Sequence, residues 1–141
     1  MTTHIMALTY APKIEAVKAG TIRQTMRLIN IGDTIPAGLK VKHISDELLF
    51  HTWAGRPYRS KWDWRELFKV KEVLHLFYTH DTWRWWPDMP DALAPIGRQA
   101  MEEIATLDGI VPPTLEELEK VQMKLNGLKS LNNTDWEVTR W

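Results

Sequence analysis

The chain has 141 residues, and its 18 basic and 18 acidic side chains leave it without net charge. This balance excludes a surface that is basic throughout and binds nucleic acid indiscriminately. The absence of cysteine excludes disulfides, thiol nucleophiles and zinc sites built on thiolates. The length suits one domain, residues 1–141, that buries its core without disulfides or metals.

The sequence predicts a cytoplasmic protein with no membrane partner. Its apolar runs are shorter than the ~18 residues of a membrane span, and the N-terminus lacks the basic start and apolar core of a secretion signal. Residues 1–90 carry 13 basic and 9 acidic side chains, whereas residues 91–141 carry 5 and 9. The first part therefore suits a polyanion better, although so modest an imbalance is also typical of ordinary solvated charges.

The chain is expected to begin with a strand over residues 4–10 and a helix over residues 11–19. Gly20 stands where a C-cap glycine ends a helix. Residues 20–27 are then expected to form a loop that leaves the helix at a defined point.

Two strands are predicted in the next part of the chain. Residues 39–44 alternate only in part and predict a weak strand, whereas residues 46–54 have an apolar centre and predict a stronger one. The stronger strand is expected to end before Gly55 and Pro57, because glycine permits a sharp turn and proline cannot donate to a strand ladder.

A long strand is predicted over residues 67–78, with a break in alternation near Glu72 that indicates a bulge. Residues 82–86 are expected to pair with it as a hairpin, with the turn at residues 79–81. The prolines that follow indicate an irregular connection.

The C-terminal part is predicted to hold two helices and a last strand. The first helix covers residues 96–107 and stops at Gly109. Thr114 begins a capping box, which opens a second helix that stops at Gly127. Residues 136–141 are expected to return as a strand.

The segment 20–27 concentrates polar groups beyond what a plain turn needs. It holds two arginines, whose planar charged forks fit a phosphate or the edge of a base, together with an amide and a hydroxyl that donate and accept hydrogen bonds. These residues are Arg23, Gln24, Thr25 and Arg27. The segment is therefore a candidate site for an anion or a base.

A second candidate region interleaves cations and aromatic rings over residues 53–65. Single-stranded nucleic acid needs this pattern, because cations meet phosphates while rings stack on bases. The alternative is that Trp62 and Trp64 pack in the core and the cations cover the surface. We expect the loop after Gly55 to approach Thr25 and to add four binding residues, Trp53, Arg56, Tyr58 and Arg59.

The remaining aromatic and titratable residues predict no cofactor. Trp83, Trp85 and Trp86 are expected to pack in the core, with the alternative that one ring lines a base pocket. The five histidines lack metal-site spacing, so no metal is predicted. No phosphate loop, serine nucleophile elbow or spaced carboxylate pair stands out.

Several short motifs resemble the ASCH domain, a member of the PUA-like superfamily. Similarity to the longer bacterial and phage ASCH proteins runs through the segments 7–12, 20–27, 32–33, 49–56, 105–109 and 136–141. The resemblance implies a mixed PUA-like β-barrel of about five to six strands, with an N-terminal helix and two C-terminal helices packed around it. This is an α+β fold.

Some ASCH proteins hydrolyse N4-acetylcytidine with a threonine nucleophile, a lysine that activates it and a glutamate, and others are ribonucleases or RNA binders. Thr25 matches the threonine, which makes it the candidate nucleophile. Ile22 stands at the usual lysine position and cannot accept a proton. For the glutamate, Glu72 and Glu47 are candidates.

The isoleucine favours recognition over catalysis. We therefore expect an RNA-binding or single-stranded nucleic-acid-binding module that recognises a modified nucleobase or nucleotide beside the barrel. A hydrolase of a modified nucleoside, or a ribonuclease, is the alternative. A third interpretation is a domain whose aromatic surface binds a protein partner.

Overall fold

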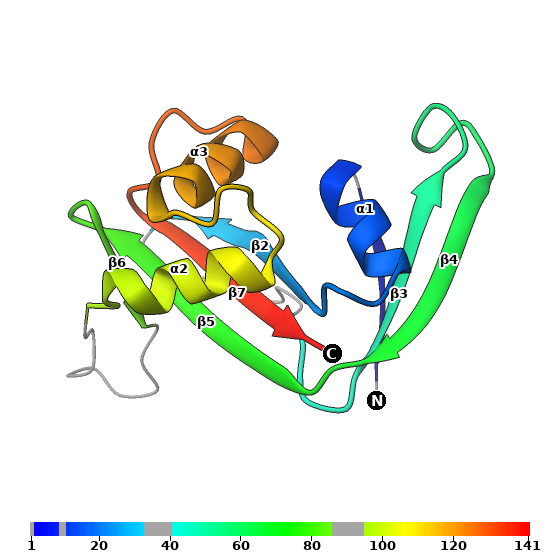
Figure 1. The fold of residues 1–141 in the computed structure, drawn as a ribbon, viewed down its shortest axis with the longest axis horizontal. Coiled ribbons are helices and arrows are strands. Elements are labelled where there is room, and N and C mark those ends of the chain that lie inside the picture. Colours follow the sequence, from blue (N-terminus) through cyan, green and yellow to red (C-terminus); the bar gives the residue numbers. More distant parts are fainter. Residues whose placement is uncertain (1, 9–10, 33–40, 86–94) are drawn as a thin grey trace.

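The computed structural model describes residues 2–8, 11–32, 41–85 and 95–141, which form an α+β fold of three helices and seven strands (Figure 1). This confirms the α+β part of the prediction. In chain order the elements are β1 (Thr3–Ala7), α1 (Ala11–Lys18), β2 (Gln24–Ile31), β3 (Glu47–Trp53), β4 (Trp62–Lys69), β5 (Glu72–Thr79), β6 (Thr82–Trp85), α2 (Arg98–Leu107), α3 (Leu115–Asn126) and β7 (Thr134–Arg140). None of the described helices is long and apolar enough to cross a membrane.

The strands form two sheets. In the three-stranded sheet, β3 pairs in parallel with β1 and antiparallel with β4. The four-stranded sheet has the order β2-β7-β5-β6, and all its pairings are antiparallel. The pairings between described residues do not join the two sheets into a closed barrel.

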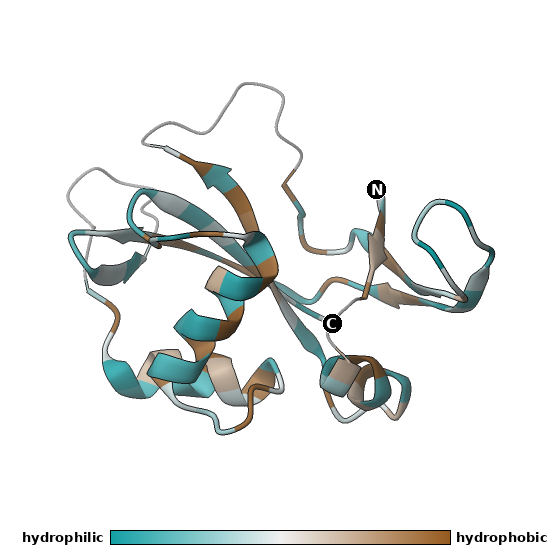
Figure 2. Ribbon diagram, turned by 90° about the horizontal axis from the view of Figure 1, so that it is seen from above, coloured by the Kyte–Doolittle hydropathy of each residue, from teal (hydrophilic) through white to brown (hydrophobic). Residues whose placement is uncertain are grey.

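Helices α2 and α3 pack against one face of the four-stranded sheet, as Figure 2 shows from above. Met101, Ile104 and Leu118 of these helices pack with Trp136 and Val138 of β7, and none of the five is more than 2% exposed. Burial of each such side chain contributes about 1.5–3 kcal/mol. This cluster is the larger of the two cores.

The second core lies between α1 and the three-stranded sheet. Val17 of α1 and Ile22 pack with Phe50 of β3 and with Trp141, which follows β7. The ring centroids of Phe50 and Trp141 are 4.7 Å apart. Trp141 thereby carries the end of the four-stranded sheet into the core of the other sheet.

The expected long strand over residues 67–78 is wrong. The chain changes sheets there, because β4 ends at Lys69 and β5 begins at Glu72. Between them, the Val70 N–H bonds the Asp46 carbonyl beside the first sheet at 2.8 Å, while the Lys71 N–H bonds the Arg140 carbonyl in the second. The break in alternation near Glu72 therefore marks a change of sheet and not a bulge.

The helix caps agree with the sequence. Gly20 follows α1 with φ 76° and Gly127 follows α3 with φ 62°, the left-handed conformation that glycine adopts without strain. The Thr114 hydroxyl accepts a hydrogen bond from the Glu117 N–H at 3.2 Å, as a capping box requires.

Several strand boundaries differ from expectation. The loop predicted over residues 20–27 is wrong in its second half, because β2 begins at Gln24 and pairs with β7. The first strand ends at Ala7. Of the weak strand predicted over residues 39–44, residues 41–44 are not a strand and the rest lies outside the described residues. The β5–β6 hairpin is confirmed, although residue 86 lies outside the described residues.

Candidate functional site

A small polar cavity lies between α1, the first residues of β2 and α3. Its volume is about 120 Å³. Both charged and neutral polar groups face it, with an apolar border from Leu8, Val121 and Leu125. The polar side of the lining consists of Lys13, Thr25, Arg27, Asp108, Gln122 and Asn126.

A buried ion pair forms one wall of this cavity. Lys13 comes from α1 and Asp108 from the residue that follows α2, and they are 6% and 3% exposed. The Lys13 Nζ atom donates to the Asp108 Oδ1 atom at 2.7 Å. Asp108 is held in place because its N–H bonds the Ile104 carbonyl in the last turn of α2.

Burial pushes both members of the pair towards their neutral forms. Loss of hydration lowers the pKa of Lys13, and the nearby Arg27 charge lowers it further, while Asp108 opposes the change. Loss of hydration likewise raises the pKa of Asp108, against the attraction of Lys13. The cavity therefore holds an amine that loses its proton more readily than an exposed lysine does.

Thr25 and Arg27 reach the cavity from β2. Thr25 is 2% exposed, and within the described part of the chain its hydroxyl makes no hydrogen bond. The Arg27 Nη2 atom donates to the Ala7 carbonyl at 2.9 Å, and burial lowers the pKa of its guanidinium. The site thus combines a buried hydroxyl, a buried amine, a carboxylate and a guanidinium.

Gln24 and Arg23 have other roles. The Gln24 amide donates to the Ile104 carbonyl and accepts from the Arg140 Nε atom, each at 2.9 Å, so it braces α2 against β7. Arg23 is exposed, and its backbone carbonyl accepts from the Trp141 N–H at 3.1 Å. Neither residue lines the cavity.

Ile22, at the expected lysine position, belongs to the core under α1 and is 9% exposed. Its Cδ1 atom occupies the space where a side chain at Gly109 would begin. The lysine of the cavity is instead Lys13, which sequence reasoning missed. Lys13 lies four residues before Val17, and both are the buried residues of α1, so its place on the apolar helix face was the available signal.

The two candidate glutamates lie elsewhere. Glu72 is exposed and pairs with Arg140 at 3.2 Å, and Glu47 is a half-buried residue at the start of β3. Neither lines the cavity, where the carboxylate is that of Asp108. Asp108 lies within the segment 105–109, which carries part of the ASCH resemblance.

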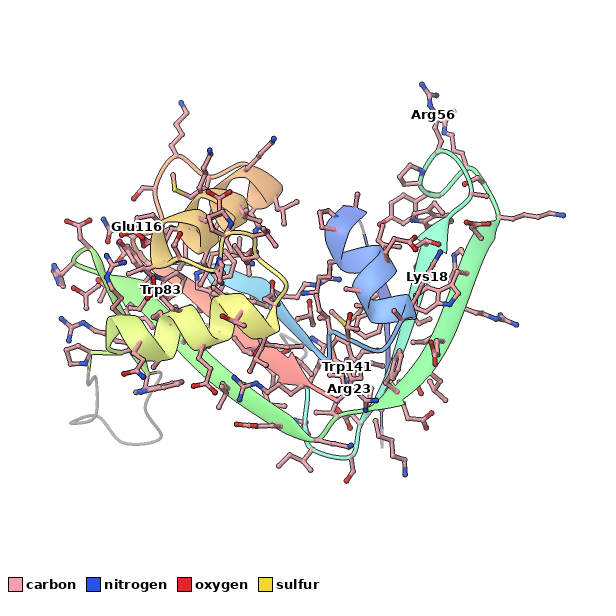
Figure 3. The ribbon with its side chains drawn as sticks, in the orientation of Figure 1. Lys18, Arg23, Arg56, Trp83, Glu116 and Trp141 are labelled. Atoms are coloured by element: carbon pink, nitrogen blue, oxygen red, sulfur yellow. The ribbon has the colours of Figure 1, made fainter. Side chains whose placement is uncertain are left out.

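The loop between β3 and β4 does not join the cavity. Trp53, Arg56, Tyr58 and Arg59 are absent from its lining, although we expected them beside Thr25. Figure 3 shows Arg56 at the tip of this loop, far from Arg23 and Trp141. The residues expected in one site are therefore divided between two places.

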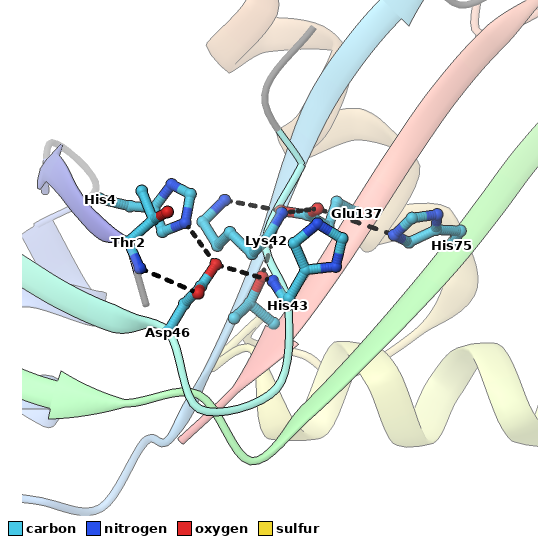
Figure 4. A network of polar contacts seen from close by, with 8 residues as sticks. Thr2, His4, Lys42, His43, Asp46, His75 and Glu137 are labelled. Carbon is cyan, nitrogen blue, oxygen red and sulfur yellow. Dashed lines mark hydrogen bonds and ion pairs between the residues drawn. The ribbon is translucent and has the colours of Figure 1, made fainter.

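A second polar network lies around Glu137 of β7, which is 1% exposed (Figure 4). Its carboxylate accepts from the Lys42 Nζ atom at 2.6 Å and from the Lys42 N–H at 2.9 Å, and the His75 Nε2 atom lies 3.7 Å away. Lys42 and His75 also border an open cleft of about 480 Å³. Because Glu137 neutralises Lys42, that cleft gains little positive charge from it.

Asp46 fastens the start of β3 to its surroundings. Its carboxylate accepts from the Thr2 N–H at 3.2 Å and the His43 N–H at 3.0 Å, and the His4 Nε2 atom lies 2.8 Å away. These hydrogen bonds, of which that of His4 has the largest effect, lower the pKa of Asp46 to about 2.

Within the described residues, no group of three histidines or carboxylates is arranged to hold a metal.

Comparisons with known proteins return no relative. No family model matches the chain, no curated protein matches it, and no solved structure matches it.

Proposed function

We propose that this chain is an ASCH-like hydrolase that removes an acyl group from a modified nucleobase in the cavity beside α1. The observation that carries the proposal is the buried Lys13 amine, which shares the cavity with Thr25 and bonds Asp108 at 2.7 Å. Ile22 stands where the ASCH resemblance places the activating lysine, and its side chain cannot accept a proton. Lys13 supplies that acceptor from a different element.

Each polar group has a role in such a reaction. The Thr25 hydroxyl attacks the acyl carbonyl carbon, and its proton passes to Lys13 in its unprotonated form, which burial favours by lowering the pKa of the amine. The Arg27 guanidinium stabilises the oxyanion that forms. Asp108 orients Lys13 and stabilises the ammonium ion.

The intermediate then collapses and breaks the bond between the acyl carbon and the base nitrogen. Lys13 returns its proton to that nitrogen, so the free base leaves and the acyl group stays on Thr25. A water molecule, which gives a proton to Lys13, attacks the ester carbon. Lys13 then gives this proton to the Thr25 oxygen as the ester bond breaks, which releases the carboxylic acid and restores the threonine hydroxyl.

The cavity volume sets a limit on what enters. At about 120 Å³, the cavity is smaller than the roughly 300–1,000 Å³ of pockets that enclose a whole drug-sized ligand. This space suits an acetylamino group and the edge of the base ring that carries it, with the sugar outside.

A PUA-like arrangement of the two sheets, with the helices at their openings, is part of the same proposal.

The test is turnover of N4-acetylcytidine, free and within single-stranded RNA, followed by chromatography of the deacetylated product. We expect Thr25→Ala to lose about 1000-fold or more in kcat/KM, as nucleophile removal does. Lys13→Arg keeps a cation for Asp108 but removes the proton acceptor, so its activity should also be lost. Lys18→Arg changes an exposed lysine of the same helix that does not line the cavity, so this matched control should retain full activity.

Recognition without turnover is the second candidate, since an amine held 2.7 Å from a carboxylate is also suited to donate hydrogen bonds to a ligand. No turnover of either substrate by the wild type would reject the hydrolase. Calorimetric binding of N4-acetylcytidine by that same protein, lost in Arg27→Gln, would then assign a recognition pocket for a modified nucleotide.

A further inference from the structure

One face of the three-stranded sheet is free of any covering helix among the described residues. Helix α1 packs against one face of this sheet (Figure 2), the face that carries Phe50. Lys18 lies 5.6 Å from the centre of the Trp64 ring on that same face. The alternate residues of β3 point the other way. Along this outer face, Ile5 and Leu67 flank Leu49 and are 61% and 52% exposed.

A bulge brings an extra aromatic ring to the outer face. Thr52 pairs with Trp64 and Trp53 with Trp62, so Asp63 is the additional residue on β4. Without it, Trp62 and Trp64 would share a face. With it, Trp62 stacks on His51, with ring centroids 4.0 Å apart and planes at 13°.

Two further aromatic rings extend this cluster beyond His51. The Trp53 ring meets His51 edge-on at 5.0 Å, and Tyr58 lies 5.3 Å beyond Trp53. His51 is 4% exposed, and burial lowers its pKa, which favours the neutral form of the ring. Aromatic rings in mutual contact therefore cluster where the loop of the β3–β4 hairpin leaves the sheet.

Tyr58 is held in an unfavourable backbone conformation. Its φ is 63°, a region that a bulky residue rarely adopts, and its side chain is 90% exposed. An exposed ring returns little packing energy for this strain. Backbone strain that no packing in the fold offsets points to a role in binding.

The same hairpin is basic although the whole chain is neutral. Residues 53–69 carry five basic and two acidic side chains, a net charge of +3. Within the described residues, no carboxylate forms an ion pair with Arg56, Arg59, Lys61 or Arg65. These cations remain available to phosphates around the aromatic rings.

We propose that this hairpin surface, formed by Trp53, Arg56, Tyr58, Arg59, Lys61 and Arg65, binds single-stranded nucleic acid. Bases stack on Tyr58 and Trp53 while the cations meet the phosphates. Unstacked bases are required, so a duplex of the same sequence binds more weakly. The surface is separate from the Thr25 cavity and does not depend on hydrolysis there.

The test is fluorescence anisotropy of a labelled 12-nucleotide oligouridine at 50 mM salt. Tyr58→Asn removes the ring and suits the left-handed backbone, so the variant should be at least as stable as the wild type yet bind about five- to tenfold more weakly. Arg56→Gln with Arg59→Gln should weaken binding and flatten the salt dependence by ~1.4 in the log–log slope, at ~0.7 for each phosphate contact. Lys124→Gln with Lys129→Gln, which removes two exposed charges beyond the hairpin, is the matched control and should bind as the wild type does.

Four results would overturn the proposal: no binding by the wild type, equal weakening in the Lys124 and Lys129 control, equal affinity for a duplex, or concentration-dependent self-association in place of oligouridine binding. Thr25→Ala separates this surface from the cavity. It should bind oligouridine as tightly as the wild type, and a loss equal to that of Tyr58→Asn would refute a second site.

Discussion

Lys13 and Asp108 form a buried ion pair at 2.7 Å although 95 residues separate them in the chain. The pair joins α1, which packs on the three-stranded sheet, to the end of α2, which packs on the four-stranded sheet. It therefore contributes both to the cohesion of the fold and to the wall of the cavity. Removing the ion pair should therefore lower the stability of the fold and, independently, change the chemistry of the cavity.

Lys13→Met should destabilise the protein by about 3–5 kcal/mol, because the Asp108 carboxylate would remain buried without its partner. Asp108→Leu should cost a similar amount by stranding the ammonium group. The double variant should recover most of the loss, since two apolar groups leave no charge unpaired. Urea unfolding of the four proteins measures the cycle, and additive losses would show that the pair is not coupled.

Asp46 should make stability depend on acid pH. Its folded-state pKa is about 2 against an ordinary value of 3.8, so its carboxylate binds protons less readily in the folded protein than in the unfolded chain. Its contribution is therefore fully present above ~pH 4 and is lost as the pH falls towards ~2.

Thermal unfolding between pH 5 and pH 2 measures this effect. Asp46→Asn should be less stable than the wild type at pH 5, and the difference should shrink as the pH falls. Asp63→Asn, an exposed carboxylate on β4, is the control. A difference between wild type and Asp46→Asn that stays constant down to pH 2 would contradict the assignment.

Gly109→Ala should destabilise the protein more than Gly127→Ala. Both glycines have positive φ, 79° and 62°, so both substitutions strain the backbone by about 1 kcal/mol. At Gly109 the new methyl group would also collide with the Ile22 Cδ1 atom, whereas nothing lies within 4 Å at Gly127. Because the Cδ1 atom is the end of a side chain that can rotate aside, chemical denaturation should give a further loss of about 0.5–1.5 kcal/mol at Gly109.

Adding Ile22→Ala tests the collision itself. The smaller side chain removes the clashing atom, so Gly109→Ala should cost less in the Ile22→Ala background than in the wild type. An equal cost in both backgrounds would attribute the whole effect to the backbone.

Thr114→Ala should cost about 1 kcal/mol, because the Glu117 N–H would lose the hydroxyl that accepts its hydrogen bond at 3.2 Å. Thr114→Ser keeps the acceptor and should be close to the wild type. Thermal unfolding compares the three proteins, and an alanine variant as stable as the serine variant would show that the cap adds nothing.

Local features of this protein could be predicted from the sequence because their causes lie within a few residues. Gly20 and Gly127 end helices through their own backbone freedom, and Thr114 caps a helix through a residue three positions away. The change of sheet after Lys69 could not be predicted in this way. A run of alternating residues looks the same whether its two halves pair in one sheet or in two.

The composition of the candidate site was decided by tertiary structure. The sequence alone determined that Thr25 and Arg27 follow a capped helix, and that cations and aromatic rings alternate over residues 53–65. Only the fold brings Lys13 and Asp108 to Thr25 in one cavity and leaves Arg56 outside its lining. Contacts across such separations depend on how helices and sheets pack, and the spacing of residues along the chain does not encode that packing directly.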